Sequence, residues 1–158
     1  MNNRTLGCLI AVTLLASCTV TNERSVAQTP EPSKFTVARI YCTPDNESHF
    51  DTVAVDLAKV DAAPPAMPFY AKGSAATRVA FAAFEPGWGA QDEKAKKYHP
   101  APAAQYVIYL SGQMTVIASD GQSRRFGVGD VLRLEDVAPC KGHISVVGAA
   151  AAHTMVVR

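Results

Sequence analysis

The chain has 158 residues, of which 48% are hydrophobic and 18% are charged. This balance supplies enough apolar side chains for one hydrophobic core and excludes an intrinsically disordered chain. The 15 basic residues are matched by 14 acidic residues, and no long basic run occurs. A chain of this kind is not expected to bind nucleic acid, because phosphate contacts require clustered lysine and arginine.

The first 17 residues have the pattern of a bacterial secretory signal, a basic start followed by an apolar stretch over residues 6–16. That stretch is too short to form a stable membrane-spanning anchor. It ends Leu15-Ala16-Ser17-Cys18, which resembles the lipobox of bacterial lipoproteins. We therefore expect cleavage before Cys18 and lipidation of this cysteine. The alternative is an ordinary signal peptide cleaved after Ala27, which would remove Cys18.

The lipobox resemblance also implies a location. Thr19, not aspartate, follows Cys18, so the resemblance implies a protein of the bacterial cell envelope, anchored to the outer membrane and facing the periplasm. The membrane is then one partner, held through several acyl chains. Residues 18–33 are polar, contain two prolines and predict a flexible tether. The expected organisation is a signal peptide over 1–17, this tether, and one domain over 34–158.

Two cysteines remain in the mature chain, because Cys8 is removed with the signal and Cys18 carries lipid. In an oxidising compartment we expect the remaining pair, Cys42 and Cys140, to form a disulfide. A bridge that closes so long a loop stabilises a fold by about 4–5 kcal/mol in the chain-entropy model. Two alternatives stay open. The pair are buried free thiols, or Cys140 is a metal ligand or reactive thiol close to His143.

The domain is predicted to be all-β. It contains about ten short strand-like runs separated by turn residues, and no long helical pattern, which is typical of a sandwich or a barrel. Asp120-Gly121 between two such runs indicates a hairpin. Residues 61–68 contain three prolines and predict a loop, whereas residues 91–97 could form one or two helical turns. The predicted strands include residues 35–42, 50–57, 77–84, 106–110, 113–118, 143–147 and 153–157.

The middle of the chain carries the spacing of two motifs. His99, Gln105 and Gly112 fall where the first motif of the cupin superfamily has a histidine, a glutamate and a glycine. Gly129-Asp130 and His143 fall where the second cupin motif has its Gly-Asp start and its last histidine. The chain therefore resembles a cupin, and the resemblance implies a cupin jelly-roll barrel, also called a double-stranded β-helix.

The resemblance covers residues 84–157 and has two departures from the usual pattern. Ala101 stands where the second histidine is expected, and Gln105 replaces the glutamate. A closer likeness is to small single-domain cupins with a His-x-x-Pro-x-x-Gln-Tyr start and a Glu-Asp…Gly-Lys-Gly-His end. In this chain Cys140 takes the place of the first of those late glycines.

The resemblance implies a site inside the barrel formed by His99, Gln105 and His143. Two imidazoles and an amide oxygen could hold one divalent metal ion, such as Fe, Ni, Mn, Zn or Cu, although an amide is a weaker ligand than a carboxylate. Three functions are compatible with this set of residues. They are a metal-dependent enzyme, a metal-free module that binds a small-molecule ligand, and a structural envelope lipoprotein with a vestigial site.

Four further residues are candidates for the pocket: His49, Trp88, Tyr109 and Asp136. Asp136 could supply the missing carboxylate or orient His143, or it could be a turn residue that accepts backbone hydrogen bonds. Trp88 could be a lid or a packing anchor, and His49 is otherwise a strand-edge histidine. The resemblance also implies that edge strands pair two copies into a homodimer.

Overall fold

The computed structural model describes residues 31–90 and 97–158. The predicted signal peptide, its lipidation site Cys18 and almost all of the tether lie outside the described residues. So do residues 91–96, most of the segment for which helical turns were considered. In the described part of the chain, no helix is long and apolar enough to cross a membrane.

The described residues form an all-β fold, as the sequence predicts. The strands are β1 (Lys34–Cys42), β2 (Ser48–Asp56), β3 (Ala58–Val60), β4 (Phe69–Ala71), β5 (Val79–Phe84), β6 (Gln105–Ser111), β7 (Gln113–Ala118), β8 (Ser123–Gly127), β9 (Val131–Glu135), β10 (His143–Val147) and β11 (Ala152–Val157).

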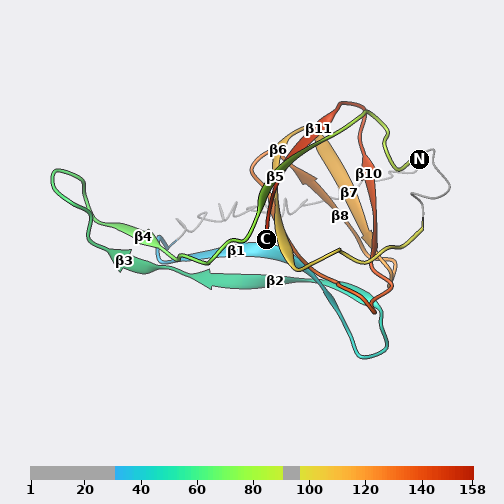
Figure 1. Cartoon of the computed structure of the whole chain (residues 1–158), viewed down its shortest axis with the longest axis horizontal. Helices are drawn as coiled ribbons and strands as arrows, with labels where there is room; N and C mark the ends of the chain where they lie inside the picture. The colour runs from blue at the N-terminus through green and yellow to red at the C-terminus, as the bar shows by residue number, and fades with distance from the viewer. Residues whose placement is uncertain (1–30, 91–96) are drawn as a thin grey trace, which may run out of the picture.

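Two larger sheets pack face to face as a sandwich, and neither sheet closes on itself (Figure 1). One sheet has six strands in the order β2-β1-β9-β6-β11-β5, and the other has three in the order β10-β7-β8. Neighbouring strands are antiparallel, except that β1 and β9 run parallel. The arrangement brings β6, β9, β10 and β11, which are distant in sequence, around one interior.

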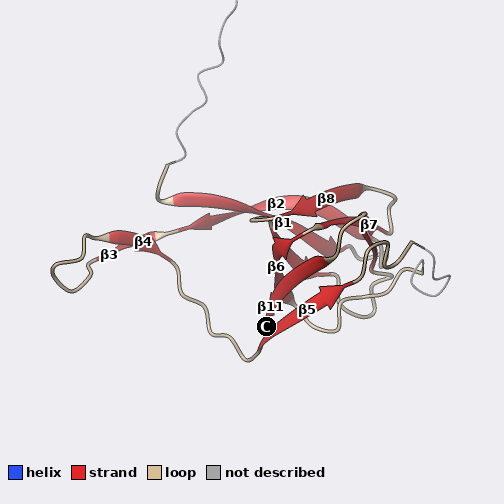
Figure 2. Cartoon of the chain, turned by 90° about the horizontal axis from the view of Figure 1, so that it is seen from above, coloured by secondary structure: helices blue, strands red, loops and turns tan. Residues whose placement is uncertain are grey.

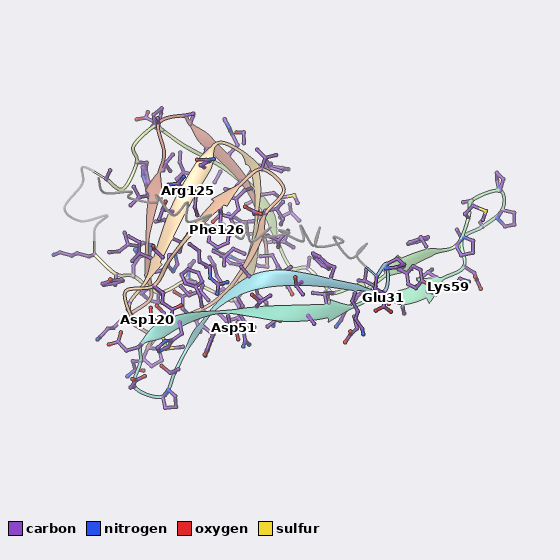
Figure 3. All side chains as sticks on the ribbon, turned by 180° about the vertical axis from the view of Figure 1, so that it is seen from behind. Glu31, Asp51, Lys59, Asp120, Arg125 and Phe126 are labelled. Atoms are coloured by element: carbon purple, nitrogen blue, oxygen red, sulfur yellow. A yellow bond between two sulfur atoms is a disulfide. The ribbon has the colours of Figure 1, made fainter. Side chains whose placement is uncertain are left out.

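The interior is built by strands that bury every second side chain, because successive side chains in a strand point to opposite faces. Met114, Val116 and Ala118 of β7 follow this alternation and are all buried. Phe126 of β8 lies within the body of the sandwich (Figure 3) and stacks on Tyr109 of β6, with ring centroids 5.3 Å apart. Since β8 and β6 belong to different sheets, this pair joins the two layers.

The disulfide between Cys42 and Cys140 is present, with the two Cα atoms 5.8 Å apart. It excludes the alternatives in which these cysteines are free thiols or Cys140 is a metal ligand. The bridge connects the end of β1 to the loop between β9 and β10. The same loop receives a hydrogen bond from Ser48 Oγ to Gly142 O (2.6 Å), so it is fixed to the start of β2 at two points.

Strands β3 and β4 form a two-stranded ribbon that projects from the sandwich (Figures 1 and 2). The sequence predicts the proline-containing loop at its tip but not the ribbon itself. Lys59 lies far out along it (Figure 3). Met67, Phe69 and Tyr70 are exposed. The ribbon therefore contributes nothing to the core that positions the site described next.

Candidate functional site

A cavity of about 190 Å³ lies between the two sheets. Its wall is mostly apolar, and strands β6, β7, β9 and β11 supply it with Val107, Met114, Val116, Leu132, Leu134 and Val156. The polar side chains that line it are His99, Gln105, Tyr109, His143, Ser145 and Thr154. The three residues predicted to form a site, His99, Gln105 and His143, therefore lie around one space.

A buried histidine–aspartate pair stands at this cavity. His143 begins β10 and is 6% exposed, and Asp136, just after β9, is completely buried. Asp136 Oδ2 lies 2.6 Å from His143 Nδ1. With Nδ1 held by the carboxylate, Nε2 is the ring nitrogen left to meet a bound molecule. Asp136 was predicted either to bind a metal, to orient His143 or to be a turn residue. The observed contact corresponds to the second role, because the carboxylate orients the imidazole of His143.

The carboxylate of Asp136 is only half satisfied. Its Oδ1 atom is buried and has no hydrogen-bond partner among the residues described. Asp136 itself does not line the cavity, whereas its partner His143 does. A buried carboxylate is costly unless it is hydrogen-bonded, so the single contact with His143 carries much of its compensation.

His99 lies beside His143 and is exposed, which places it at the rim of the cavity. The two rings are 5.0 Å apart, tilted by 49°, and the two residues exchange backbone hydrogen bonds of 3.1 and 2.9 Å. Gly142 makes this approach possible. It has φ of 85°, and a Cβ atom there would lie 2.0 Å from the carbonyl oxygen of His99. Glycine is therefore required at this position by both backbone conformation and space.

Gln105 is engaged by the C-terminal residue. Arg158 Nε donates a hydrogen bond of 2.8 Å to Gln105 Oε1. This oxygen is the atom that was expected to act as a metal ligand. The guanidinium takes one of the two lone pairs of this oxygen, and the NH₂ group of Gln105 remains as a donor.

The residues of the site do not fit a resident divalent cation. The buried Ala101 offers no ligand at the expected histidine position, and the positive charge of Arg158 lies on the oxygen of Gln105. Asp136 contacts His143 Nδ1 and does not line the cavity. Within residues 31–90 and 97–158, no three His, Cys, Asp or Glu side chains gather in a way that could hold a metal. Two imidazoles alone make a weak site.

Tyr109 is a buried tyrosine that lines the cavity. It is 2% exposed, and burial, with a smaller contribution from the Asp130 carboxylate, raises the pKa of Tyr109. The negative form of a phenol is disfavoured in a low dielectric. The hydroxyl of Tyr109 therefore stays protonated and is available as a donor.

Thr154 is a site residue that the sequence analysis did not identify. It is 1% exposed and lines the cavity, and its Oγ1 has no hydrogen-bond partner in the described part of the chain. Thr154 pairs with Tyr109 across β11 and β6, so the two side chains are neighbours on one face. The available signal was a hydroxyl at an inward position of the last strand, between Ala152 and Val156.

Trp88 also lines the cavity and is partly exposed, which places it at the rim. Its ring packs on Phe84 at a centroid distance of 5.0 Å, and its carbonyl accepts a 2.9 Å hydrogen bond from the backbone of Val147. The turn that carries Trp88 is also close to β10 at Gly89, where a Cβ would lie 2.1 Å from Ser145 O. These contacts describe a packing anchor at the rim.

His49 does not line the cavity, in contrast to its prediction as a pocket residue. Its neighbours on β2, Ser48 and Phe50, are buried in the sandwich, so strand alternation turns His49 to the opposite face. There His49 Nδ1 lies 2.7 Å from Asp120 Oδ2. Figure 3 shows Asp120 at the end of the sandwich where β2 begins.

Comparison with known proteins identifies no family. A scan against protein-family models found no match for the chain, and a search of the curated proteins found no similar sequence. The chemistry of the site is therefore inferred from its own side chains.

Proposed function

We propose that this chain is an exported, lipid-anchored protein whose sandwich is a cupin-like jelly roll, and that its cavity binds a small molecule without a metal ion. The observation that carries the proposal is the buried Asp136–His143 pair at an otherwise mostly apolar cavity. Apolar side chains would fill this interior at lower cost than a buried carboxylate. The pair is best explained by the imidazole that it holds toward a ligand.

The metal-free version is favoured by the contacts of Gln105. Its amide oxygen is hydrogen-bonded to Arg158, and a cation at that oxygen would be repelled by the guanidinium. The same contact leaves a donor group for a ligand. His143, Gln105 and Tyr109 then act as hydrogen-bonding groups for the polar end of a molecule whose apolar body contacts the wall.

The proposed fold and location rest on the sequence motifs together with the disulfide. Gly129-Asp130 and His143 support the cupin-like jelly roll, and Leu15-Ala16-Ser17-Cys18 supports lipidation and export to the outer membrane, facing the periplasm. The Cys42–Cys140 bridge fits an oxidising compartment.

Two measurements test the proposal on the full chain after export. Elemental analysis by mass spectrometry should find no stoichiometric metal. A screen of small polar-ended molecules should find compounds that raise the melting temperature of the wild type, with or without chelator, and that lose this effect in His143→Ala. His49→Ala is the matched control, because His49 is also bonded to an aspartate but lies outside the cavity.

A different result would favour the metal-dependent enzyme. Near-stoichiometric iron, nickel, manganese, zinc or copper that is lost in both His99→Ala and His143→Ala would contradict the metal-free proposal. Ligand binding abolished by chelator would do the same.

A further inference from the structure

We infer that the projecting ribbon of β3 and β4 is a membrane-contacting element, which lays its apolar face on the phospholipid bilayer that holds the lipid anchor. This inference rests on the proposed function, since it gives the anchored chain a second point of contact with the membrane. It is drawn from the two faces of the ribbon, from its charges, and from the place where the chain enters the sandwich.

The ribbon has one apolar face and one mixed face. Residues directly opposite each other on paired strands point to the same side, and successive residues along a strand point to opposite sides. The register places Val60 opposite Phe69, and Lys59 opposite Tyr70. The apolar face therefore carries Val60 and Phe69, whereas the other face carries a cation and a phenol. The apolar face is completed by one more cross-strand pair, Ala58 and Ala71.

The apolar face is exposed. Val60 is 37% exposed and Phe69 is 50% exposed, and Met67, in the loop that joins the two strands, is 81% exposed. The rest of that loop, residues 61–68, consists of alanines, prolines and one aspartate. Contiguous apolar surface of this kind on a projecting element indicates a site for a partner or a membrane, because its contact with water is unfavourable.

The N-terminal end of the described chain lies at the base of the ribbon. Leu57, between β2 and β3, donates a backbone hydrogen bond of 2.7 Å to Ser33 O. Figure 3 shows Glu31 at this end of the sandwich, with Lys59 farther out on the ribbon. The segment from Cys18 to Glu31 spans at most about 45 Å even when fully extended. A bilayer that holds a lipidated Cys18 is therefore close to the ribbon.

The charges of the ribbon favour a phospholipid surface. Within residues 57–74 the charged side chains are Lys59, Asp61 and Lys72, so the segment carries a net positive charge. Anionic headgroups attract such a segment. The long stem of a lysine also allows its ammonium group to stay at the headgroups while apolar neighbours enter the acyl region.

The size of the apolar face favours a bilayer over a second copy of the chain. A stable protein–protein interface buries about 1,200–2,000 Å² and uses about 20–30 residues on each side. The apolar face of the ribbon has four strand side chains, which is far fewer. A lipid anchor removes this requirement, because it converts the contact of the ribbon with the membrane into an intramolecular one at high effective concentration.

The test places tryptophan probes on the full, exported and lipidated chain in vesicles of phosphatidylethanolamine and phosphatidylglycerol with brominated acyl chains, which quench nearby indoles. We expect the added emission of Phe69→Trp to fall at least about twofold, because an interfacial apolar face lies about 5–10 Å into the boundary between headgroups and acyl chains. Tyr70→Trp, on the opposite face, should be quenched less. The wild type, whose one tryptophan is Trp88, supplies the background.

Two further variants control the measurement. Tyr98→Trp is the matched control, because Tyr98 and Tyr70 are both 41% exposed and Tyr98 adjoins His99 at the cavity rim, away from the ribbon. Its emission should not be quenched. Val60→Asp, added to Phe69→Trp, should restore the emission, since an unpaired charge on the apolar face opposes its insertion. All variants should keep the wild-type melting temperature, because the ribbon contributes nothing to the core.

The intact mass of the exported chain separates the two proposals. A chain without acyl groups contradicts the lipid anchor, and the ribbon inference falls with it. A lipidated chain in which Phe69→Trp is quenched no more than Tyr98→Trp overturns the ribbon inference alone, and a crosslinked dimer in that sample would assign the ribbon to a second copy. Equal quenching of Phe69→Trp and Tyr70→Trp would overturn the assignment of the contact to the apolar face.

Discussion

The sandwich contains two histidine–aspartate pairs with nearly the same contact and opposite surroundings. His143 Nδ1 lies 2.6 Å from Asp136 Oδ2, and His49 Nδ1 lies 2.7 Å from Asp120 Oδ2. The side chains of the first pair are 8% and 0% exposed, and those of the second are 29% and 13% exposed. The hydrogen bond is therefore not what distinguishes them. Burial beside a cavity turns one pair into a candidate site, while solvent leaves the other as part of the surface.

The comparison shows that the alternation of side chains along a strand decides which of the two histidines faces the interior. His49 and His143 both lie at the start of a strand, β2 and β10. Phe50 takes the inward position next to His49, whereas His143 itself is inward. A shift of one residue along a strand exchanges the two faces, so the register of β2 alone decides that His49 cannot reach the cavity.

The largest expected effect comes from removing the disulfide that fixes the loop between Asp136 and His143. The bridge joins residues 98 apart in sequence, and closing a loop of that length stabilises a fold by about 4–5 kcal/mol. We expect the Cys42→Ser/Cys140→Ser double variant to lose about this free energy of unfolding, measured by urea denaturation. A loss below about 1 kcal/mol would show that the hydrogen bond from Ser48 to Gly142 is sufficient to hold the loop.

The next largest expected effect is the difference in stability lost when each of the two histidine–aspartate pairs is broken. Asp136→Ala leaves a buried imidazole without its partner, and such losses cost about 3 kcal/mol. His49→Ala removes a partly exposed pair, for which about 1 kcal/mol or less is expected. Urea denaturation of both variants measures the difference. Equal losses would mean that the burial of His143 adds nothing, and the contrast between the pairs would be lost.

A smaller effect is expected at Thr154, where the substitution should not lower the free energy of unfolding and could raise it. Because its hydroxyl is buried without a partner among the described residues, Thr154→Val should leave the ligand-free protein as stable as the wild type or up to about 1 kcal/mol more stable. Valine has nearly the same shape as threonine, with a methyl group in place of the hydroxyl, so the substitution removes the unsatisfied group. Thermal unfolding without ligand checks this. A destabilised variant would mean that the hydroxyl is satisfied within the fold.

Sequence patterns predict the sandwich core well, because alternation in a half-buried strand is a local property. The bounds of β7 and β10 agree with the predicted residues 113–118 and 143–147. The projecting ribbon was not predicted, since β3 and β4 have three residues each, lie exposed and flank a proline-rich tip. Nothing in such short segments shows alternation between a buried and an exposed face.

The candidate site was predictable only in part. Motif spacing brought His99, Gln105 and His143 together before the fold was known. The hydrogen bond from Arg158 to Gln105 joins residues 53 apart in sequence, and no local sequence pattern predicts a contact between residues so far apart. Thr154 was not predicted for a related reason. Threonine is common in strands, and only the pairing of β11 with the strand of Tyr109 places Thr154 at the cavity.

The smallest predicted effect concerns the exposed side of the sandwich, near Asp120, where Asp51 lies (Figure 3). The hydrogen bond from Arg39 lowers the pKa of Asp51. A carboxyl whose pKa is lower in the folded state stabilises the protein above its unfolded pKa, and this contribution is lost as the pH falls through the folded value. Because the pair is partly exposed, the contribution should be about 1 kcal/mol or less.

Asp51→Asn should therefore lower stability near neutral pH by this amount and make the decline in stability between about pH 5 and pH 2 less steep. Urea denaturation across that range measures the slope, with wild type alongside. If the variant declines as steeply as the wild type, Asp51 does not contribute to acid unfolding. The acid sensitivity would then lie in other carboxylates whose pKa is lowered in the fold, such as Glu47, which accepts a hydrogen bond from Lys141.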